Sequence, residues 1–461
     1  MAKLQTRTTF VCRDCGAESP RWEGRCPQCG TWNSLEEAIQ RTPRFRHSAS
    51  STPTRPPQEL ASISLSQNPR IPLHLSEFNR VLGGGIVPGS LILVGGEPGI
   101  GKSTLLLQVA ATLAEDGNTI LYASGEESEQ QIRLRASRLG IKGRNLYILA
   151  SNNLDAILRY MDQMTPRLVV IDSIQAVYLE DSTSSPGSPG QIREATWRLM
   201  EWSKATNVPV FITGHVTKEG AIAGPRMLEH MVDVVLYMEG EPYSPYRLLR
   251  GVKNRYGSTN EVGIMEMGDK GLSDVANPSQ ALLSERSPEA VGSAVTPTLE
   301  GTRPLMVEIQ ALTSLTSFNL PRRTANGIDL NRLLLVTAVL SKRLGARLAN
   351  QDIIVSVVGG LRIREPAADL ALALAIMSSL KDRAIKPGLV AVGELGLSGE
   401  IRSVAQLERR LQEAAQLGLH RGIIPGSHSK GLSIPKGMEL TRVGTLSEAV
   451  KAALGEKRKT V

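Results

Sequence analysis

The residues best suited to chemistry form one glycine-rich stretch in the first half of the chain. The stretch consists of Gly96, Glu97, Pro98, Gly99, Ile100, Gly101, Lys102, Ser103 and Thr104. This order is a complete Walker A loop, whose glycines let backbone N–H groups close around phosphates. Lys102 then reaches the β and γ phosphates, and the hydroxyl of Ser103 is a ligand for Mg2+. The stretch therefore predicts a site for ATP and Mg2+.

The segments on either side of this loop have the composition that the motif requires. Residues 90–94 form a short apolar run before it, and residues 105–113 form a longer apolar run after it. The first run is consistent with a buried parallel strand, and the second with a helix whose positive N-terminal end faces the anion. We therefore expect a P-loop domain of the α/β class.

Carboxylates follow two further predicted strands of this domain. The apolar run 168–171 ends in Asp172, the Walker B position, where a carboxylate holds Mg2+ through water. The run 119–123 leads to Glu126 and Glu127, and a carboxylate at the end of a strand beside the loop is placed to act as general base. We favour Glu126 as the base, with Glu127 as the second choice. The alternative is that both are exposed acids at a helix start, where they favour the dipole.

A histidine and two polar loops are the remaining candidates in this domain. The run 208–213 ends in Gly214 and His215, the usual place for a residue that senses the γ phosphate. A hydrogen-bonded histidine at a strand end is the alternative. Residues 181–190 and 218–226 are rich in small and polar residues, which suits either loops that grip a nucleic acid strand or plain surface loops.

All four cysteines of the chain lie within 18 residues of one another near its start. They are arranged as two Cys-x-x-Cys pairs, Cys12 with Cys15 and Cys26 with Cys29. Each pair forms a tight turn that directs two thiolates at one centre, and together they supply the tetrahedral set that zinc prefers. We predict a structural Zn2+ site; iron in the same cage and a pair of disulfides are the alternatives.

Length and composition indicate a soluble protein of about three units. The chain has 461 residues, 41% hydrophobic and 21% charged, with a formal net charge of +8 that is compatible with a polyanionic partner. No apolar run approaches the roughly 18 residues of a membrane span, and no secretory signal is evident, so we expect a cytoplasmic protein. We divide the chain into a zinc module at 1–35, a linker at 36–70, an ATPase domain at 71–275 and a further α/β domain at 276–461.

Four separate features together resemble one known family. They are the Walker A loop, the Ser-Gly-Glu-Glu-Ser segment at 124–128, the segment Lys253-Asn-Arg255-Tyr256-Gly257 and the four-cysteine module. On these features the chain resembles the RadA family, also called Sms, of bacterial DNA repair proteins. The five-residue segment usually has Phe where this chain has Tyr256.

The resemblance implies a function that the residues alone do not. It implies a RecA-like core in a hexameric ring, with ATP between subunits and with Lys253 and Arg255 reaching the γ phosphate of the neighbouring subunit. A cation supplied in this way stabilises charge on the transferring phosphoryl group. It also implies a DNA-dependent, helicase-like ATPase that acts on single-stranded and branched DNA, drives branch migration and has the RecA recombinase as partner.

The last domain resembles the proteolytic domain of Lon protease around residues 361–369. That fold carries a catalytic serine directly after a proline, and this chain has Ala367 there; near the expected lysine the best match is Glu408. Without the hydroxyl no acyl intermediate forms, so we expect no protease activity. Assembly or DNA contact are the remaining roles, and the arginines available for phosphates are Arg322, Arg323, Arg343, Arg362 and Arg364.

Two other functions compete with the DNA motor. One is a regulatory ATPase switch of the KaiC type, which shares the RecA-like core but does not translocate on DNA. The other is an ATP-dependent protease of the Lon type, against which the missing serine argues. Stimulation of ATP hydrolysis by DNA distinguishes the motor from the switch.

Overall fold

A computed structural model describes most of the chain, in eleven stretches. They are residues 7–19, 21–40, 59–62, 69–182, 184–215, 228–240, 244–284, 286–287, 289–317, 320–427 and 432–454. The chain divides into two compact units, one of residues 1–239, 247–259 and 265–274 and one of residues 240–246, 260–264 and 275–461. Most of the expected linker and the whole of the polar loop 218–226 lie outside the described residues.

The cysteine-rich module is a small antiparallel sheet with two turns. Its strands are β1 (Arg7–Cys12), β2 (Glu18–Ser19) and β3 (Leu35–Gln40), with β1 in the centre. Among the described residues of this module, the buried apolar core consists of Cys12, Cys26 and Leu35. So small a core cannot stabilise a fold by burial alone, which is the usual situation of a module that a metal holds together.

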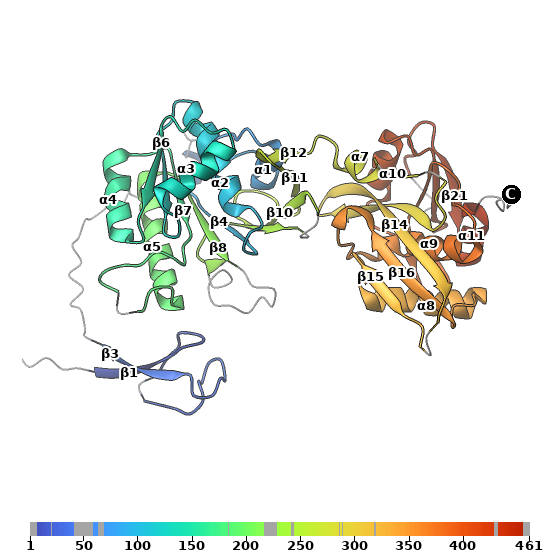
Figure 1. Ribbon diagram of the computed structural model, residues 1–461, viewed down its shortest axis with the longest axis horizontal. Helices are drawn as coiled ribbons and strands as arrows, with labels where there is room; N and C mark the ends of the chain where they lie inside the picture. The colour runs from blue at the N-terminus through green and yellow to red at the C-terminus, as the bar shows by residue number, and fades with distance from the viewer. Residues whose placement is uncertain are drawn as a thin grey trace, which may run out of the picture. The chain divides into compact units, whose positions relative to one another are not determined.

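The phosphate-loop domain is built on a nine-stranded sheet (Figure 1). The strand order is β12-β11-β10-β9-β4-β8-β7-β5-β6, and the six strands from β9 to β6 run parallel. The parallel strands are β4 (Leu91–Gly96), β5 (Ile120–Ser124), β6 (Leu146–Ala150), β7 (Leu168–Asp172), β8 (Val210–His215) and β9 (Val234–Glu239). The others are β10 (Tyr246–Asn254), β11 (Val262–Gly268) and β12 (Gly271–Asp274).

Helices cover both faces of this sheet, which explains why its central strands are apolar throughout. Packed on one face are α1 (Ser76–Leu82), α2 (Lys102–Glu115) and α3 (Glu129–Arg138); on the other are α4 (Leu154–Met164) and α5 (Pro189–Thr206). Every residue of β4, β5 and β7 is buried. A parallel sheet that is covered on both faces requires such continuous apolar runs. The strands expected at 90–94, 119–123, 168–171 and 208–213 are confirmed.

The second unit is a separate α/β domain on a seven-stranded mixed sheet in the order β15-β16-β14-β13-β17-β20-β21. Its strands are β13 (Ser293–Glu300), β14 (Arg303–Leu315), β15 (Arg323–Asn326), β16 (Gln351–Val357), β17 (Leu389–Ala391), β20 (Arg421–Pro425) and β21 (Glu439–Val443). Its helices are α7 (Pro278–Leu283), α8 (Leu330–Leu344), α9 (Asp369–Lys381), α10 (Leu407–Gln416) and α11 (Leu446–Ala453). Figure 1 shows α7 and α10 on one side of the sheet and α8 and α9 on the other.

A helix that crosses a bilayer must be both long and apolar. Within the described stretches, no helix combines the length and the apolar character that a bilayer crossing requires.

Candidate functional site

The phosphate loop joins the end of β4 to the start of α2, where only glycine fits at two positions. Gly96 has φ of 154°, and a Cβ there would lie 2.6 Å from the carbonyl oxygen of Met238. Gly101 has φ of 115°, and a Cβ there would lie 2.5 Å from the Met267 side chain. The loop is therefore shaped by glycine for backbone N–H groups to approach an anion, as the sequence predicts.

Lys102 lies inside this loop rather than in solvent. Its Nζ donates hydrogen bonds to the carbonyl oxygens of Gly96 at 2.9 Å and Glu97 at 3.0 Å. Burial lowers the pKa of Lys102, and the negative charges of Asp172 and Glu126 oppose that shift. The two carbonyl partners are neutral, and a phosphate oxygen that replaces them would form a charge-assisted hydrogen bond with the ammonium group.

Asp172 is the meeting point of four elements of the site. Its Oδ1 accepts hydrogen bonds from Ser103 Oγ at 3.2 Å and Thr213 Oγ1 at 2.6 Å, and its Oδ2 accepts one from Tyr122 at 2.6 Å. A hydroxyl and a carboxylate at this separation form the oxygen pair between which P-loop proteins hold Mg2+. The residues present therefore fit Mg2+ bound with ATP.

Two of these contacts were not anticipated from the sequence. Tyr122 lies in the middle of β5 and Thr213 in β8, and both side chains are buried. Burial beside Asp172 raises the pKa of Tyr122 well above its ordinary value, so the phenol stays a hydrogen-bond donor. A lone tyrosine or threonine in an apolar strand carries no sequence signal for such a contact, because the pairing arises from strand order.

The structure gives the two adjacent glutamates different partners. The Glu127 carboxylate forms an ion pair with Arg135 of α3. Glu126 instead accepts a hydrogen bond from Ser173 Oγ, directly beside Asp172. The backbone N–H groups of both glutamates donate to Ser124 Oγ, at 3.3 and 3.0 Å. The Glu126 carboxylate thus faces the metal and phosphate side of the site, while the Glu127 carboxylate is neutralised.

Lys253 and Arg255 lie at the opposite edge of the same sheet. Gly96, at the C-terminal end of β4, pairs with Met238, whereas Asn254 pairs with Val234 at the N-terminal start of β9. The backbone N–H of Arg255 donates to the carbonyl of Asp233, one residue beyond that start. Five strand residues separate this level from Gly96, which is about 16 Å along the strand. Lys253 and Arg255 therefore do not share a nucleotide with Lys102 of their own subunit.

Both cations are held in defined positions at that edge. Lys253 Nζ donates to three carbonyl oxygens, those of Glu229 at 2.7 Å, His230 at 3.2 Å and Val232 at 2.8 Å. Burial lowers the pKa of Lys253, and the neighbouring Arg255 charge lowers it further. Arg255 Nη1 lies 3.3 Å from Asp233 Oδ1.

The backbone of this segment is fixed to the start of the domain. Asn254 Nδ2 donates to the carbonyls of Val81 and Leu82 at the end of α1, and its Oδ1 accepts from the backbone N–H of Tyr256 at 2.9 Å. Arg70 donates to the carbonyl of Tyr256 at 2.6 Å. The two cations thus project from an anchored turn.

The remaining candidates of this domain are placed only in part. His215 ends β8, and its backbone pairs with Gly96, so it lies on the strand beside the phosphate loop. Its side chain lies outside the described residues, as does the loop 218–226. Whether His215 senses the γ phosphate therefore stays a prediction.

The four cysteine sulfurs converge on one point. All four lie within 4.8 Å of one another, with Cys12 Sγ 3.6 Å from Cys29 Sγ and Cys15 Sγ 3.6 Å from Cys26 Sγ. None forms a disulfide. Four sulfurs bound to zinc at about 2.3 Å in a tetrahedron lie about 3.8 Å apart, so the spacing fits that ion.

The two cysteine turns have the same backbone design. Gly16 N–H donates to the Cys12 carbonyl at 2.8 Å, and Gly30 N–H donates to the Cys26 carbonyl at 2.9 Å. Both glycines have positive φ, 72° and 76°. Two matching turns that each present a pair of thiolates to a common centre are what the spacing predicts.

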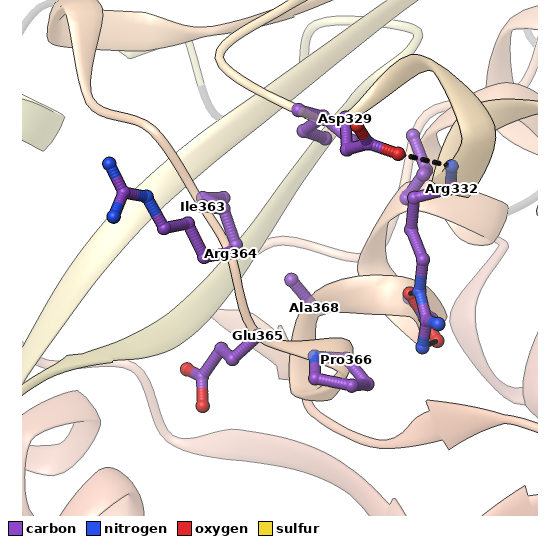
Figure 2. Close-up of a pocket in the computed structure, with 10 residues that line it drawn as sticks. Asp329, Arg332, Ile363, Arg364, Glu365, Pro366 and Ala368 are labelled. Atoms are coloured by element: carbon purple, nitrogen blue, oxygen red, sulfur yellow. Dashed lines mark hydrogen bonds and ion pairs between the residues drawn. The ribbon is translucent and has the colours of Figure 1, made fainter. Parts of the chain in front are cut away.

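The second unit contains a cavity of about 220 Å3 at the start of α9. Figure 2 shows Arg332 on one side of the cavity and Arg364 and Glu365 on the other. Arg332 Nε donates to Asp369 Oδ1 at 2.6 Å, and the Leu395 N–H donates to Asp369 Oδ2 at 3.1 Å. All ten lining residues are described, and none of them carries a hydroxyl, thiol, imidazole or amine.

The position where a protease of this fold has its nucleophile is apolar. Ala367 is buried in a hydrophobic cluster with Val390 and Leu411. Glu408, the sequence match to the lysine region, accepts a hydrogen bond from the Ser433 N–H at 2.8 Å. Arg410, two residues after Glu408, is the nearby cation in place of the lysine. It is 1% exposed and donates to both oxygens of Glu365, at 2.7 and 2.5 Å. The resemblance to the Lon protease domain does not point to Arg410.

Comparisons with known families match each part of the chain. Residues 56–221 match an AAA domain, residues 10–37 a rubredoxin metal binding domain, and residues 318–428 subunit ChlI of Mg-chelatase. With the fold and the sites described above, these matches define a P-loop ATPase with a RecA-like core, a four-cysteine zinc module and a C-terminal α/β Lon-protease-like domain.

Full-length relatives identify the family. The DNA repair protein RadA of Bacillus subtilis is 52% identical over 99% of this chain and 100% of the relative, and that of Listeria monocytogenes is 51% identical over 98% and 100%. The chain therefore belongs to the RadA family of DNA repair proteins. A KaiC-like protein of Pyrococcus horikoshii has 22% identity and a TM-score of 0.38 over 45% of this chain and 99% of that one, too low to support an argument.

Proposed function

We propose that this chain is a DNA-dependent ATPase that works as a ring-shaped motor on DNA, with each ATP bound between two subunits. One observation carries the proposal: Lys102 and Arg255 lie at opposite edges of one sheet, so a nucleotide that contacts both must lie between neighbouring copies. A closed ring satisfies this arrangement for every copy. A hexamer is the ring size that the family resemblance favours.

In this proposal each residue has a defined task. Lys102 and the loop amides bind the phosphates, while Ser103 and Asp172 hold Mg2+, which neutralises charge on the β and γ phosphates. Glu126 accepts a proton from the attacking water, because its carboxylate bonds to Ser173 directly beside Asp172, whereas the Glu127 carboxylate is paired with Arg135. Lys253 and Arg255 of the next subunit stabilise the charge that develops on the transferring phosphoryl group, an effect of about 10^3 to 10^5 in rate.

The DNA substrate and the partner follow from the family. The relatives are named DNA repair proteins, which supports a role in recombinational repair for this chain. We propose that it acts on single-stranded and branched DNA, drives branch migration and works with the RecA recombinase. Arg322, Arg343, Arg362 and Arg364 of the second unit are exposed and suit contacts with DNA phosphates.

The first experiment measures ATP hydrolysis with and without single-stranded DNA, for wild type and for Lys102→Ala. We expect DNA to stimulate the wild type and the variant to lose about 10^2- to 10^3-fold, the effect of removing one essential phosphate donor. A wild-type rate that DNA leaves unchanged would favour a regulatory switch over a motor.

A mixing experiment tests the shared site directly. Lys102→Ala subunits keep Arg255, and Arg255→Ala subunits keep Lys102, so mixed rings contain some interfaces with both residues intact. We expect two nearly inactive variants to regain hydrolysis when they are mixed under exchange conditions. If the mixture stays as inactive as its parts while native mass spectrometry shows mixed assemblies, the shared site is excluded.

We also propose that the zinc is structural. Four protein thiolates leave no open coordination position, and ligation worth about 10 to 16 kcal/mol folds a module that has almost no core. Removal of zinc by a zinc-selective chelator, with Mg2+ kept in excess, should unfold residues 10–32, seen as a change in Trp22 and Trp32 fluorescence, without loss of basal ATP hydrolysis. Metal analysis of the purified protein should give one zinc per chain, and a protein without zinc or iron would contradict the assignment.

A further inference from the structure

The cation-bearing edge of the ATPase sheet contains a buried carboxylate that the proposed reaction does not use. Asp233, directly before β9, is 2% exposed. Its backbone N–H donates to the Leu91 carbonyl at 3.0 Å, and its Oδ2 accepts from the Leu91 N–H at 3.0 Å. The carboxylate is therefore fixed to the first residue of β4.

Two cations from different elements share this carboxylate. Lys204, in the last turn of α5, places Nζ 2.7 Å from Asp233 Oδ2 and 3.1 Å from the Tyr256 hydroxyl. Arg255 Nη1 lies 3.3 Å from Asp233 Oδ1. Burial lowers the pKa of Lys204, but its hydrogen bonds to Asp233 and Tyr256 outweigh burial and raise it, so Lys204 stays charged.

The distances show how the single negative charge is divided. Lys204 makes the shorter contact with Asp233, and Arg255 makes the longer one. About half of each cationic side chain remains exposed, 45% for Lys204 and 54% for Arg255. Because Lys204 takes much of the carboxylate charge, Arg255 is oriented by Asp233 without being fully neutralised by it.

We propose that Asp233 is the positioning residue for Arg255, and that Lys204 is the counter-ion that keeps Arg255 available to the phosphates of the neighbouring subunit. The proposal rests on the shared nucleotide site described above. In this arrangement Asp233 limits the directions in which the Arg255 guanidinium can point. Lys204 weakens the attraction between Asp233 and Arg255 enough for a phosphate to compete.

Removing Lys204 should therefore impair hydrolysis through its effect on Arg255. In Lys204→Met, Arg255 is the one ion-pair partner that Asp233 keeps among the described residues, with the Lys253 charge nearby, and Asp233 holds Arg255 more closely. We expect kcat for ATP hydrolysis by the full-length protein to fall about 10- to 100-fold, as for a catalytic group displaced by about 1 Å. The dissociation constant of a fluorescent ATP analogue should change less than about twofold, because Lys102 lies at the other edge of the sheet.

A double-mutant cycle separates this role from a merely structural one. Asp233→Asn keeps an acceptor for the Leu91 N–H but removes the charge, so Lys204 has nothing left to neutralise. We expect Lys204→Met to have less than about twofold effect on kcat in the Asp233→Asn background. Lys204→Arg restores the cation and should restore most of the wild-type rate.

Arg198→Met is the matched control on the same helix. Arg198 is exposed and forms no hydrogen bond or ion pair with the described residues, so its removal should leave hydrolysis and the unfolding temperature unchanged. The proposal is overturned if Lys204→Met hydrolyses ATP at the wild-type rate. It is also overturned if the loss persists unchanged with Asp233→Asn, or if it accompanies a lower unfolding temperature or loss of the assembly.

Arg255→Ala distinguishes failure of this proposal from failure of the shared site. We expect Arg255→Ala to lose about 10^3-fold or more in rate. If Arg255→Ala is impaired and Lys204→Met is not, only the role of Lys204 and Asp233 fails. If Arg255→Ala is fully active, the shared site itself fails.

Discussion

The nucleotide site and the cavity of the Lon-protease-like domain both lie at the start of a largely buried helix, α2 in one case and α9 in the other. They differ in how they hold charge. Lys102 donates to two carbonyls of the phosphate loop itself and feels the charges of Asp172 and Glu126 from the same site, whereas Arg332 and Arg410 each form a close ion pair with one carboxylate. A phosphate can replace the loop carbonyls on the cation, while a close ion pair satisfies the cation within the fold. The first arrangement prepares a reaction and the second stabilises a structure.

The largest expected effect is on ATP hydrolysis at the nucleotide site. Glu126→Gln removes the proposed base and should lower ATP hydrolysis about 10^2- to 10^4-fold while nucleotide still binds. The measurement is single-turnover hydrolysis together with binding of a fluorescent ATP analogue.

Glu127→Gln is the matched variant. It breaks the pair with Arg135, so it should lower the unfolding temperature and reduce the rate less than Glu126→Gln does. If Glu127→Gln lost more activity than Glu126→Gln, the assignment of the base would have to be reversed.

A smaller effect is expected on the stability of the Lon-protease-like domain. Arg410→Met leaves Glu365 without its ion pair and the Pro297 carbonyl without a donor. We expect a loss of about 3 kcal/mol in the stability of this domain, the low end for a broken buried pair because Glu365 is partly exposed. Urea unfolding measures it, with basal ATP hydrolysis as the check on the other unit.

Arg364→Met is the control for that loss. Arg364 lies nearby and is exposed, so its replacement should change stability by less than about 0.5 kcal/mol. Equal losses from both variants would mean that the Arg410 pair contributes nothing of its own.

The smallest effect is expected from restoring a hydroxyl. Ala367→Ser should not degrade casein, because the cation beside it is an arginine, which does not deprotonate and is paired with Glu365. Degradation above the wild-type background, abolished by a serine-reactive inhibitor, would show that the domain lacks only its nucleophile.

The sequence revealed those parts of the molecule whose chemistry is local. The phosphate loop and the Cys-x-x-Cys turns are short motifs, in which spacing along the chain fixes the spacing of atoms. The buried strands were also recognisable, because a sheet covered on both faces needs uninterrupted apolar runs.

The contacts that the sequence did not reveal join residues far apart in the chain. Tyr122 and Asp172 are 50 residues apart, and Lys204 and Asp233 are 29 apart. Each pair meets only because of strand order and helix packing, and each residue type alone is common on any protein. Arg410 was missed for a related reason, since an arginine on a polar helix resembles a solvated one until its partner Glu365 is placed.

Strand β4 has a consequence for how one subunit would behave among others. Its first residue, Leu91, is bonded to Asp233, and its last, Gly96, provides a carbonyl for Lys102. Leu91 and Gly96 are five residues apart, about 16 Å along a strand whose residues are all buried, and they separate the Arg255 side of the sheet from the phosphate loop. A strand so short and so tightly enclosed has little room to absorb a shift at either end, so in the ring proposed above we expect ATP hydrolysis at neighbouring sites to be coupled.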